Sequence, residues 1–420
     1  MISWQSAVGS RQESVFIIGP VPPYRAGIAY CTMRLAEELG AEVISFHRQF
    51  PKSLYPGSSD IDPTLPRYDA RFLLDVINPL TWIRTAMLLR RERPNAVILV
   101  WWVWVWALPY LTLLAFLPKT TRVILQCHNI GDKEPAAWKR ALTNLVLRRG
   151  DVLVVHAKTE AEDARKRLRV ASSELREQSP ERPAQLGTRN SQLIITTFLP
   201  VHELGGAIPS RDDARRALGL RGNIALFFGH VRPFKGLDIA LRAWRVLKSD
   251  ATLVVAGEAW WKGEEEYRAL AQGLDNVRFD FRFIPDAEIA TYFAACDVVL
   301  APYRIEAQSG VALTAFHFAR PVIATSVGGL PEIIEEGRNG LLVPPEDPAA
   351  LAAAVDAFFA RDDRETMERH AAESARKYSW EEYGRVFEGL VDATVGSWRL
   401  AVGRGDPPPT ANRQPPTPKS

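Results

Sequence analysis

Residues 227–236 read Phe-Phe-Gly-His-Val-Arg-Pro-Phe-Lys-Gly, a segment in which two glycines flank two cations. The apolar run Ile224–Phe228 predicts a strand before the first glycine, and the apolar spacing of Leu237–Leu247 predicts a helix after the second. Cations at the start of a helix oppose its dipole, so Arg232 and Lys235 make sense if an anion lies between them. We interpret both as candidate diphosphate ligands, and the alternative is a solvated basic turn.

The same alternation of strand, glycine turn and helix recurs in both halves of the chain. It predicts an α/β protein with two parallel sheets, each covered by helices, and a linker near residues 195–208. Helices are expected at Ile28–Leu39 and Ala287–Ala294 among others. The expected strands are Ser14–Ile18, Ala41–Phe46, Ala96–Val103, Arg122–Cys127, Asp151–His156, Ile224–Phe228, Thr252–Ala256, Val277–Phe283, Val298–Ala301 and Val322–Thr325.

The domain division follows from this alternation. We expect a first Rossmann-like domain over residues 1–195 and a second over residues 196–380. A last helix, residues 381–400, is expected to pack back toward the first domain. Residues 170–191 are rich in Ser, Glu, Arg, Gln and Pro and predict a flexible loop, and the Pro-rich residues 401–420 predict a disordered tail.

Three further strand ends carry candidate ligand contacts, because ligands of open parallel sheets bind at the carboxyl ends of strands. In the first half, Gly27 ends a Gly/Pro loop where backbone could approach a ligand, or simply connect two elements. His128 closes the strand Arg122–Cys127 and is either a hydrogen-bond donor at a cleft or a structural histidine. His230, after Gly229 in the opening stretch, is a third candidate donor to an anion.

The loop after Val298–Ala301 is the other candidate. Its Gln308-Ser309-Gly310 segment is expected to start a helix, so the backbone N–H groups of Ser309, Gly310 and Val311 could hold a phosphate. Glu306, in the same loop, could accept hydrogen bonds from sugar hydroxyls, and otherwise it is a surface carboxylate.

Composition excludes several classes of protein. The chain has 420 residues, of which 47% are hydrophobic and 24% charged, so it is globular and long enough for two domains. A net charge of +3 is too balanced for a dedicated nucleic-acid binder, and no nucleic-acid partner is expected. Three scattered cysteines suggest neither a disulfide framework nor a thiolate zinc site, and a reducing, cytoplasmic compartment fits them. The N-terminus has no apolar signal core.

Residues 95–117 carry no charge and are long enough for a transmembrane helix. Pro109 divides the run, and its first half, residues 97–103, is β-branched and aromatic. We therefore expect a buried strand, a turn and a short helix over Leu108–Phe116. A true membrane span and an element that touches the membrane surface remain the alternatives.

A second segment, Trp138–Arg149, has helical apolar spacing with a basic fringe. With Arg84 and the arginines at 90, 91 and 93 it could lie on an anionic membrane, at the inner face, as a peripheral contact. The alternative is a core-facing helix with a solvated basic face.

Other chemistries find no support in the sequence. No cluster of His, Cys, Asp and Glu has the spacing of metal ligands, and no D-x-D motif is present, so no metal is expected. The P-loop motif and the Gly-x-Ser-x-Gly elbow of serine hydrolases are also absent.

About 140 residues from Ala225 onward resemble retaining glycosyltransferases of family 4, which have the two-domain GT-B fold. The resemblance rests on an ordered series of phrases: GHVRPFKGLDIALRAW, LVVAGE, CDVVLAPY and EAQSGVALTAFHFARPVIATSVGGLPEIIEEGRNGLLVPPEDPAALAAAV. The first half matches more loosely, through PPYRAGIA and QCHN. The resemblance implies metal-independent transfer of a sugar from a nucleotide-sugar, UDP- or GDP-linked, to a hydroxyl acceptor, with retention at the anomeric carbon. It also implies a role in polysaccharide or glycolipid assembly, with a sugar or lipid-linked acceptor.

The resemblance also implies roles for individual residues. Lys235 takes the place of the family's phosphate-binding lysine, Glu306 that of the first glutamate of its motif, and His128 that of its cleft histidine. Thr314 stands where the second glutamate, the ribose contact, is expected, and a threonine cannot make a carboxylate's bidentate contact. His230 stands where many members have an arginine, which Arg232 could replace.

Three functions are consistent with these features. The first is front-face transfer assisted by the leaving phosphate, because no carboxylate nucleophile is evident in the matching first-domain segment. The second is a non-catalytic subunit of a polysaccharide-assembly complex, which Thr314 favours. The third is a nucleotide-sugar epimerase, which would need paired carboxylates in the cleft.

Overall fold

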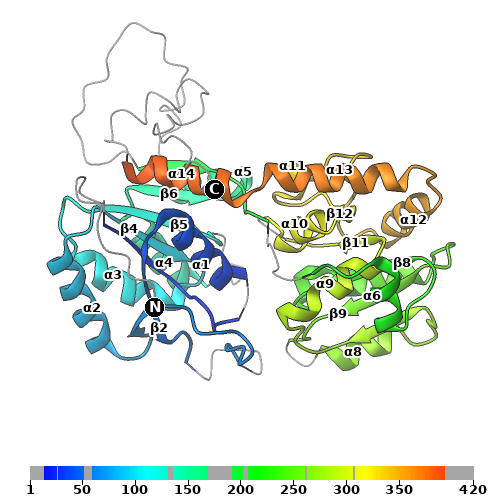
Figure 1. The fold of residues 1–420 in the computed structure, drawn as a ribbon, viewed down its shortest axis with the longest axis horizontal. Helices are drawn as coiled ribbons and strands as arrows, with labels where there is room; N and C mark the ends of the chain where they lie inside the picture. Colours follow the sequence, from blue (N-terminus) through cyan, green and yellow to red (C-terminus); the bar gives the residue numbers. More distant parts are fainter. Residues whose placement is uncertain are drawn as a thin grey trace, which may run out of the picture.

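Two parallel β-sheets organise the chain, each with helices on both faces (Figure 1). The computed structural model describes residues 14–25, 27–51, 59–130, 136–168, 192–201, 207–260, 263–305 and 308–392. The α/β class and the two Rossmann-like sheets expected from the sequence are confirmed.

The first sheet has seven parallel strands in the order β3-β2-β1-β4-β5-β6-β7. Its central strands are uninterrupted aliphatic runs, such as VFII and AVILVW, because helices bury both faces of the sheet. The strands are β1 (Val15–Ile18), β2 (Glu42–Arg48), β3 (Arg71–Asp75), β4 (Ala96–Trp101), β5 (Arg122–Cys127), β6 (Val152–Val155) and β7 (Leu193–Thr196).

The second sheet repeats this topology in six parallel strands, in the order β10-β9-β8-β11-β12-β13. In both sheets the strand order reverses beside the first strand, at β1/β4 and at β8/β11. Such reversals leave a crevice where loops diverge and ligands bind. The strands are β8 (Ile224–Phe228), β9 (Thr252–Ala256), β10 (Val277–Asp280), β11 (Val298–Ala301), β12 (Val322–Thr325) and β13 (Gly340–Val343).

The helices of the first domain form two layers. Helices α1 (Gly27–Leu39) and α14 (Trp380–Asp392) pack their apolar residues against one face of the sheet, around Leu35, Trp380 and Phe387. The other face carries helices α2 (Pro79–Glu92), α3 (Ala107–Phe116) and α4 (Ala137–Leu147). A 3₁₀ turn at Trp104–Trp106 directly precedes α3. Helix α5 (Lys158–Leu168) follows β6.

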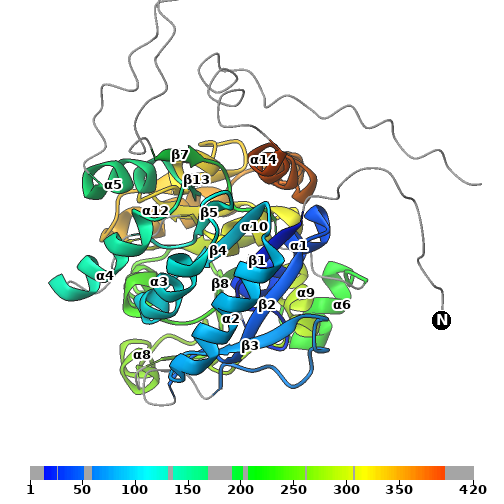
Figure 2. The ribbon, with the colours of Figure 1, turned by 90° about the vertical axis from the view of Figure 1, so that its left-hand side faces the viewer.

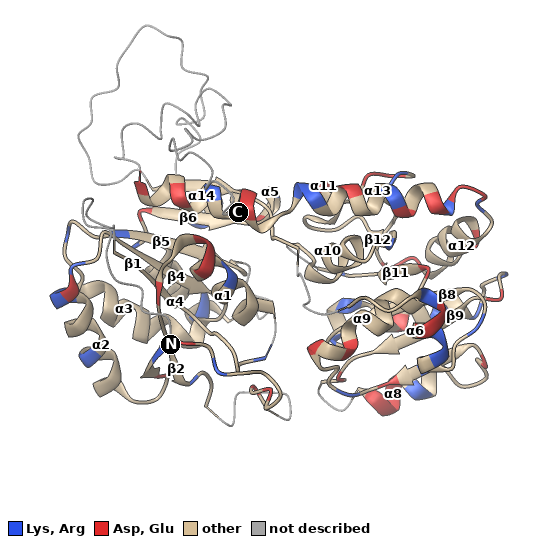
Figure 3. Cartoon of the chain, in the orientation of Figure 1, with Lys and Arg blue, Asp and Glu red and all other residues tan. Residues whose placement is uncertain are grey.

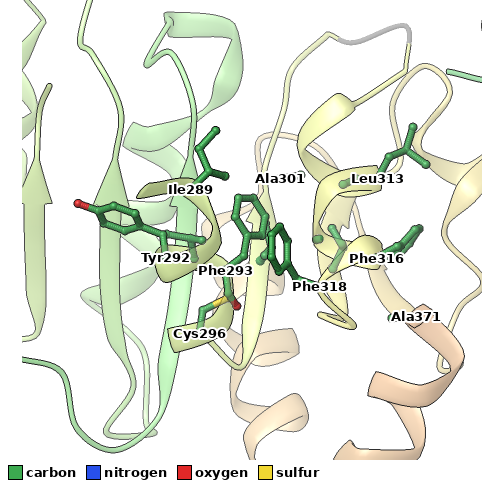
Figure 4. Packing of buried hydrophobic residues seen from close by; sticks show 14 of the residues in the cluster. Ile289, Tyr292, Phe293, Cys296, Ala301, Leu313, Phe316, Phe318 and Ala371 are labelled. Atoms are coloured by element: carbon green, nitrogen blue, oxygen red, sulfur yellow. The ribbon is translucent and has the colours of Figure 1, made fainter. Parts of the chain in front are cut away.

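The second domain is layered in the same way. One face of its sheet carries α7 (Leu237–Trp244), α8 (Glu264–Leu270) and α12 (Pro348–Phe359). On the other face, Phe293, Phe316 and Phe318 lie at the centre of an apolar cluster (Figure 4). The helices in contact with that cluster are α6 (Arg211–Leu218), α9 (Asp286–Ala295), α10 (Gly310–His317), α11 (Leu330–Ile333) and α13 (Arg364–Lys377).

The chain crosses between the domains twice, and the two crossings are hydrogen-bonded to each other. The Val201 N–H donates to the Tyr378 carbonyl over 2.9 Å, and the Trp380 indole donates to the Val201 carbonyl over 2.9 Å. After the second crossing, α14 packs on α1, where Gly384 lies against the side chain of Glu38. These contacts support, as a proposal, domain boundaries near residues 196 and 380.

The uncharged run of residues 95–117 folds as the strand β4, the 3₁₀ turn and the helix α3, as expected. In the described part of the chain, no helix has both the length and the apolarity to span a bilayer. Two strands, β3 and β13, were not predicted, and β7 closes the first sheet although the second alternating series was expected to begin near Ile194. Residues 170–191 and 401–420, the predicted flexible loop and tail, lie outside the described residues.

Candidate active site

A cavity of about 690 Å³ lies between the two domains. Its first-domain wall is the loop after β1 with the start of α1, together with residues 62–69. Its second-domain wall is made by the loops after β8, β9, β10 and β11, all at the carboxyl edge of the sheet. The cavity therefore opens at the switch points of both sheets, where ligands of this topology bind.

Two glycines shape the second-domain wall. The Gly229 N–H donates to the Ala256 carbonyl over 2.9 Å, and Gly229 has a φ of +92°. A Cβ on Gly257, whose φ is +149°, would lie 2.0 Å from the carbonyl oxygen of Gly229. The two backbones approach so closely that only glycine fits at 257, and the loop after β8 is held open toward the cavity.

Lys235 lines this cavity from the end of a 3₁₀ turn at Pro233–Lys235. Its ammonium lies 3.8 Å from the centre of the Tyr303 ring, a distance typical of a cation–π contact. Arg304 braces the turn from the loop after β11, with hydrogen bonds to the Pro233 carbonyl and to both carboxylate oxygens of Asp238 at 2.8 and 2.9 Å. Lys235 is thus positioned by its own contact with Tyr303 and by the hydrogen bonds of Arg304 that hold its turn.

His230 and Arg232 occupy different places. His230 lines the cavity, and its ring packs 4.6 Å from the Trp260 ring. Burial, followed by the positive charge of Arg232, lowers its pKa from 6.5 to about 4, so at neutral pH the imidazole is uncharged. The guanidinium of Arg232 instead lies 3.9 Å over the Trp260 ring, and Arg232 is not among the residues lining the cavity.

The first turn of α10 faces the same cavity through Gly310, Val311 and Thr314. Ser309 is buried behind them and caps the helix, because its hydroxyl accepts from the Ala312 N–H at 3.3 Å. The Gln308 side-chain oxygen accepts a hydrogen bond from the Leu199 N–H in the crossing segment. Neither Ser309 nor Gln308 lines the cavity, so their predicted donor contacts stay a prediction.

Thr314 is 6% exposed, and its hydroxyl donates to the Gly310 carbonyl over 2.8 Å. The helix backbone therefore holds this hydroxyl, and no carboxylate stands at that position. Glu306, the predicted contact of the sugar, lies outside the described residues, so its role stays a prediction.

The first-domain wall is held by hydrogen bonds between two loops. The Asp62 N–H donates to the Pro23 carbonyl and the Arg25 N–H to the Asp60 carbonyl, both over 2.8 Å. Arg25 also stacks across the cavity, with its guanidinium 4.0 Å from the Phe283 ring of the second domain. Gly27, at the start of α1, lines the cavity, and a Cβ there would meet nothing within 4 Å.

Four carboxylate residues line the cavity, and two of them, Asp62 and Asp286, face it from opposite domains. Asp62 is 2% exposed; its Oδ1 accepts from Thr64, and its Oδ2 is buried and finds no partner in the described residues. Asp286 begins α9, and burial together with the charge of Asp62 raises its pKa. The pair brings acceptors for hydroxyl groups to the side of the cavity next to the first domain.

His128 is partly buried and is not among the residues that line the cavity; it belongs to a column of stacked rings with His156 and Tyr383 in the first domain. Its ring stacks 5.0 Å from that of His156, whose Nε2 is 2.9 Å from the Tyr383 hydroxyl of α14. Burial, followed by the neighbouring His156, lowers the pKa of His128 well below 6.5. Its Nε2 is buried and has no partner in the described residues. A cleft role for His128 therefore stays a prediction.

The structure brings together much of the predicted set, and it adds residues that sequence reasoning missed. The cavity collects predicted residues from the regions that follow three strands, β1, β8 and β11, namely Gly27, Gly229, His230, Lys235, Gly310, Val311 and Thr314. It leaves out Arg232, Gln308, Ser309 and His128. Asp62, Asp286 and Glu258 were missed, although Glu258 and Asp286 follow predicted strands at the carboxyl edge. Nothing in the sequence near Asp62 signals its place.

Among the described residues, no group of three or more His, Cys, Asp and Glu side chains is arranged to hold a metal ion. Lys235 and the N-terminus of α10, both on the second-domain wall, are groups available there to an anionic ligand. All three cysteines are buried and unpaired.

Comparisons with known proteins agree with this architecture. The family described as Glycosyl transferases group 1 matches residues 222–361. D-inositol 3-phosphate glycosyltransferase of Mycobacterium marinum is 36% identical over 203 residues, which are 46% of this chain and 42% of that protein. The protein of the same name from Corynebacterium urealyticum is 28% identical over 264 residues, 60% of this chain and 58% of its own. The chain thus spans about half the length of the curated relatives it matches.

Solved structures match over both domains. Sucrose-phosphate synthase from Thermosynechococcus elongatus superposes with a TM-score of 0.66 at 19% identity, over 91% of this chain and 100% of that one. HepE of Anabaena, solved with UDP, gives 0.66 at 15% identity, over 90% and 100%. Likeness at this identity shows the fold. The chain therefore has the two-domain GT-B fold, and residues 222–361 of its second domain match the family of glycosyl transferases group 1.

Proposed function

We propose that this protein transfers a sugar from a nucleotide-sugar to a hydroxyl acceptor, with retention at the anomeric carbon and without a metal ion. One observation carries the proposal. Lys235, the open backbone at Gly229 and the first turn of α10 line one cavity at the switch point of the second sheet. This set suits a diphosphate, because a cation and free helix N–H groups face the same space.

The chemical problem is departure of a nucleoside diphosphate, on which negative charge grows as the glycosidic bond breaks. Lys235 and the N–H groups of Gly310 and Val311 are fixed before reaction, so they stabilise that charge without reorganising. These groups supply the stabilisation of negative charge that a divalent cation provides in metal-dependent transferases. Their presence supports a metal-independent reaction. The sugar becomes oxocarbenium-like, and the acceptor attacks from the face that the phosphate leaves, with a phosphate oxygen taking the acceptor proton.

The donor base is either uracil or guanine. HepE was solved with UDP and with UDP-glucose, which makes a UDP-sugar our first choice. Thr314 makes a weaker ribose contact than a carboxylate, because its hydroxyl donates to Gly310. We expect correspondingly weaker binding of the nucleoside, with most affinity from the diphosphate.

The acceptor enters on the side of the first domain. Asp62 lines this wall of the cavity, so its carboxylate is the group to which a hydroxyl of the acceptor would donate. Asp286 faces the same cavity from the second domain, so the acceptor bridges the two domains and favours their closure. We propose a sugar or lipid-linked alcohol as acceptor, on the cytoplasmic side, where three buried thiols stay reduced.

A second candidate is a non-catalytic GT-B subunit of a polysaccharide-assembly complex. Thr314 favours it, because the position lacks the carboxylate that would anchor ribose. The arrangement of Lys235 within a braced turn argues against it, since a subunit without a donor has no use for a positioned ammonium on the wall of the cavity.

The test is proton NMR of the reaction with a panel of UDP- and GDP-sugars and simple alcohol acceptors. We expect a product whose anomeric coupling matches that of the donor, formed equally well in EDTA. An inverted product would refute retention, and a product formed only with added Mg²⁺ or Mn²⁺ would refute metal independence. Nucleotide binding without any product from any donor would favour the non-catalytic subunit.

A further inference from the structure

The first domain exposes an unusual number of large apolar side chains on one layer of helices. Of the eleven exposed large hydrophobic residues in the described chain, seven lie on α2, α3, α4 or directly before α2. If exposed apolar residues were scattered at random, they would be spread over both domains. Their concentration on these helices is typical of an interaction site. They are Ile77, Leu80, Ile83, Met87, Leu108, Trp138 and Leu145, each between 44% and 62% exposed.

These residues belong to one continuous surface. Helix α3 contacts α2 on one side and α4 on the other, and Figure 2 shows the three helices side by side on the face turned to the viewer. On α2 the exposed positions Leu80, Ile83 and Met87 follow a spacing of three and four residues, which places them on one stripe. We call the exposed surface of α2, α3 and α4 the apolar–basic face.

The charges on this face are almost all positive. Helix α3 carries no charged residue (Figure 3), while Arg84, Arg90, Arg91 and Arg140 are exposed on α2 and α4. No carboxylate pairs with these four arginines within the described residues. The one acid of the three helices, Glu92, lies 3.7 Å from Arg71 of β3.

An aromatic pair stands at one end of the face. Trp138, which is 53% exposed, packs edge-on against Trp104 with ring centres 4.7 Å apart. The ammonium of Lys139 lies 5.1 Å from one ring and 5.7 Å from the other. Tryptophan beside lysine, half in water, is the combination found at the level of lipid headgroups.

The position of the face relative to the cavity follows from the topology. In parallel sheets, helices start at the carboxyl edge of the preceding strand, which here is the edge bordering the cavity. Leu80, Leu108 and Trp138 are each the second residue of their helix. The most exposed apolar side chains therefore lie along the edge at which the acceptor enters.

We propose that the apolar–basic face docks on an anionic membrane surface and that the acceptor is carried by a lipid of that membrane. Apolar side chains enter the headgroup region while the arginines meet lipid phosphates. A second copy is a poor occupant, because a two-fold interface would oppose the same arginines. Docking stands on this face alone, whereas the lipid-carried acceptor rests on the proposed transfer.

The test is co-sedimentation of the full chain with vesicles of phosphatidylcholine, alone or with 30% phosphatidylglycerol. We expect binding to the anionic vesicles only, weakened by salt. Replacing Arg84 and Arg140 by glutamine should lower the partition coefficient roughly 25-fold, because each basic residue contributes about five-fold. Leu80→Gln with Leu108→Gln should lower it at least ~10-fold. The matched control is Arg221→Gln with Val246→Gln, an exposed pair on the second domain, and it should bind like the wild type.

A second readout reports where the protein touches the membrane. The three native cysteines are buried, so a cysteine introduced by Leu145→Cys takes an environment-sensitive dye selectively. Its emission should shift to the blue on anionic vesicles, while a dye at Val246→Cys should not respond. Equal binding to neutral vesicles, absence of binding, or a dimer in sedimentation equilibrium that the Leu80 and Leu108 changes abolish would each overturn the proposal.

The two proposals fail separately. Nucleotide binding measured without vesicles should be the same in the wild type and in all face variants, because the changed residues are remote from Lys235 in the other domain. Vesicle binding by a chain that binds no nucleotide would leave docking intact and refute the transfer. Nucleotide binding with no vesicle binding would refute docking and leave the proposed transfer intact.

Discussion

Removal of the Lys235 ammonium is the perturbation that separates a phosphate contact from a structural one. In Lys235→Ala the cavity loses its best-placed cation, while the turn keeps its brace from Arg304. The control is Lys248→Ala, which removes an exposed lysine from the same domain. Lys235→Arg keeps the charge but changes its shape, so it should retain part of the activity.

The expected magnitudes differ enough to decide the question. In the folded protein, the contact of Lys235 with Tyr303 at 3.8 Å contributes about 0.5–1 kcal/mol to the free energy of unfolding. The same side chain acting on the leaving diphosphate should contribute about 2.7–4 kcal/mol to the transition state, or a ~10²–10³-fold loss in kcat. Nucleotide affinity should fall by the ~1.5–3 kcal/mol of one charged hydrogen bond.

The assays are thermal unfolding, calorimetric titration with UDP and GDP, and turnover of the donor. For Lys235→Ala we expect a shift of a few degrees at most in Tm, together with the loss of turnover and of nucleotide affinity. Turnover at the wild-type rate would refute the phosphate assignment. Loss of turnover that only accompanies a large fall in Tm would make Lys235 a structural residue.

Three further predictions address other parts of the site. Thr314→Glu should leave nucleotide binding unchanged or strengthen it up to ~10-fold if the position faces ribose; a cooperative loss of folding would place it in the core instead. Gly257→Ala should destabilise the fold by more than ~2 kcal/mol and abolish nucleotide binding, because its Cβ would lie 2.0 Å from the Gly229 oxygen; Gly40→Ala, where nothing lies within 4 Å, should cost far less and keep binding. Burial lowers the pKa of His156 from 6.5 to about 4, so the unfolded chain takes up the proton first and stability should fall as the pH drops from about 6.5 to about 4. In urea denaturation, His156→Gln should flatten this pH dependence, and an unchanged slope would contradict the shift.

Strands were predictable where burial on both faces leaves an uninterrupted aliphatic run. Arg122–Cys127 is predicted and observed with the same bounds, and so are Ile224–Phe228 and Thr252–Ala256. The strands β3 and β13 were missed because they are edge strands with mixed burial, and RFLLD and GLLV carry no distinctive pattern. Edge position also explains why β7 was not predicted, because its four residues LIIT pair with β6 alone.

The second-domain side of the site was easier to predict than the first-domain side. A glycine after a strand and a cation before a helix are local signals, and they identified Gly229 and Lys235 as cavity residues. Local signals do not show which neighbouring group a polar side chain will contact in the folded protein. Ser309 therefore turned out to cap its own helix, and Arg232 stacks on Trp260.

Contacts made across the domains lie beyond sequence reasoning. Asp62 and Asp286 are more than 200 residues apart and meet at one cavity only because the two sheets face each other. The column of His128, His156 and Tyr383 likewise depends on α14 returning from the second domain to the first. Neither spacing nor composition predicts these two sets of contacts, because both sets depend on the chain passing twice between the domains.

Calorimetric titration with UDP and GDP, each with and without EDTA, tests whether the second-domain wall binds the nucleotide of the donor. We expect one of the two nucleotides to bind with micromolar affinity and EDTA to leave the affinity unchanged. Absence of binding by both nucleotides, or binding that EDTA abolishes, would contradict it.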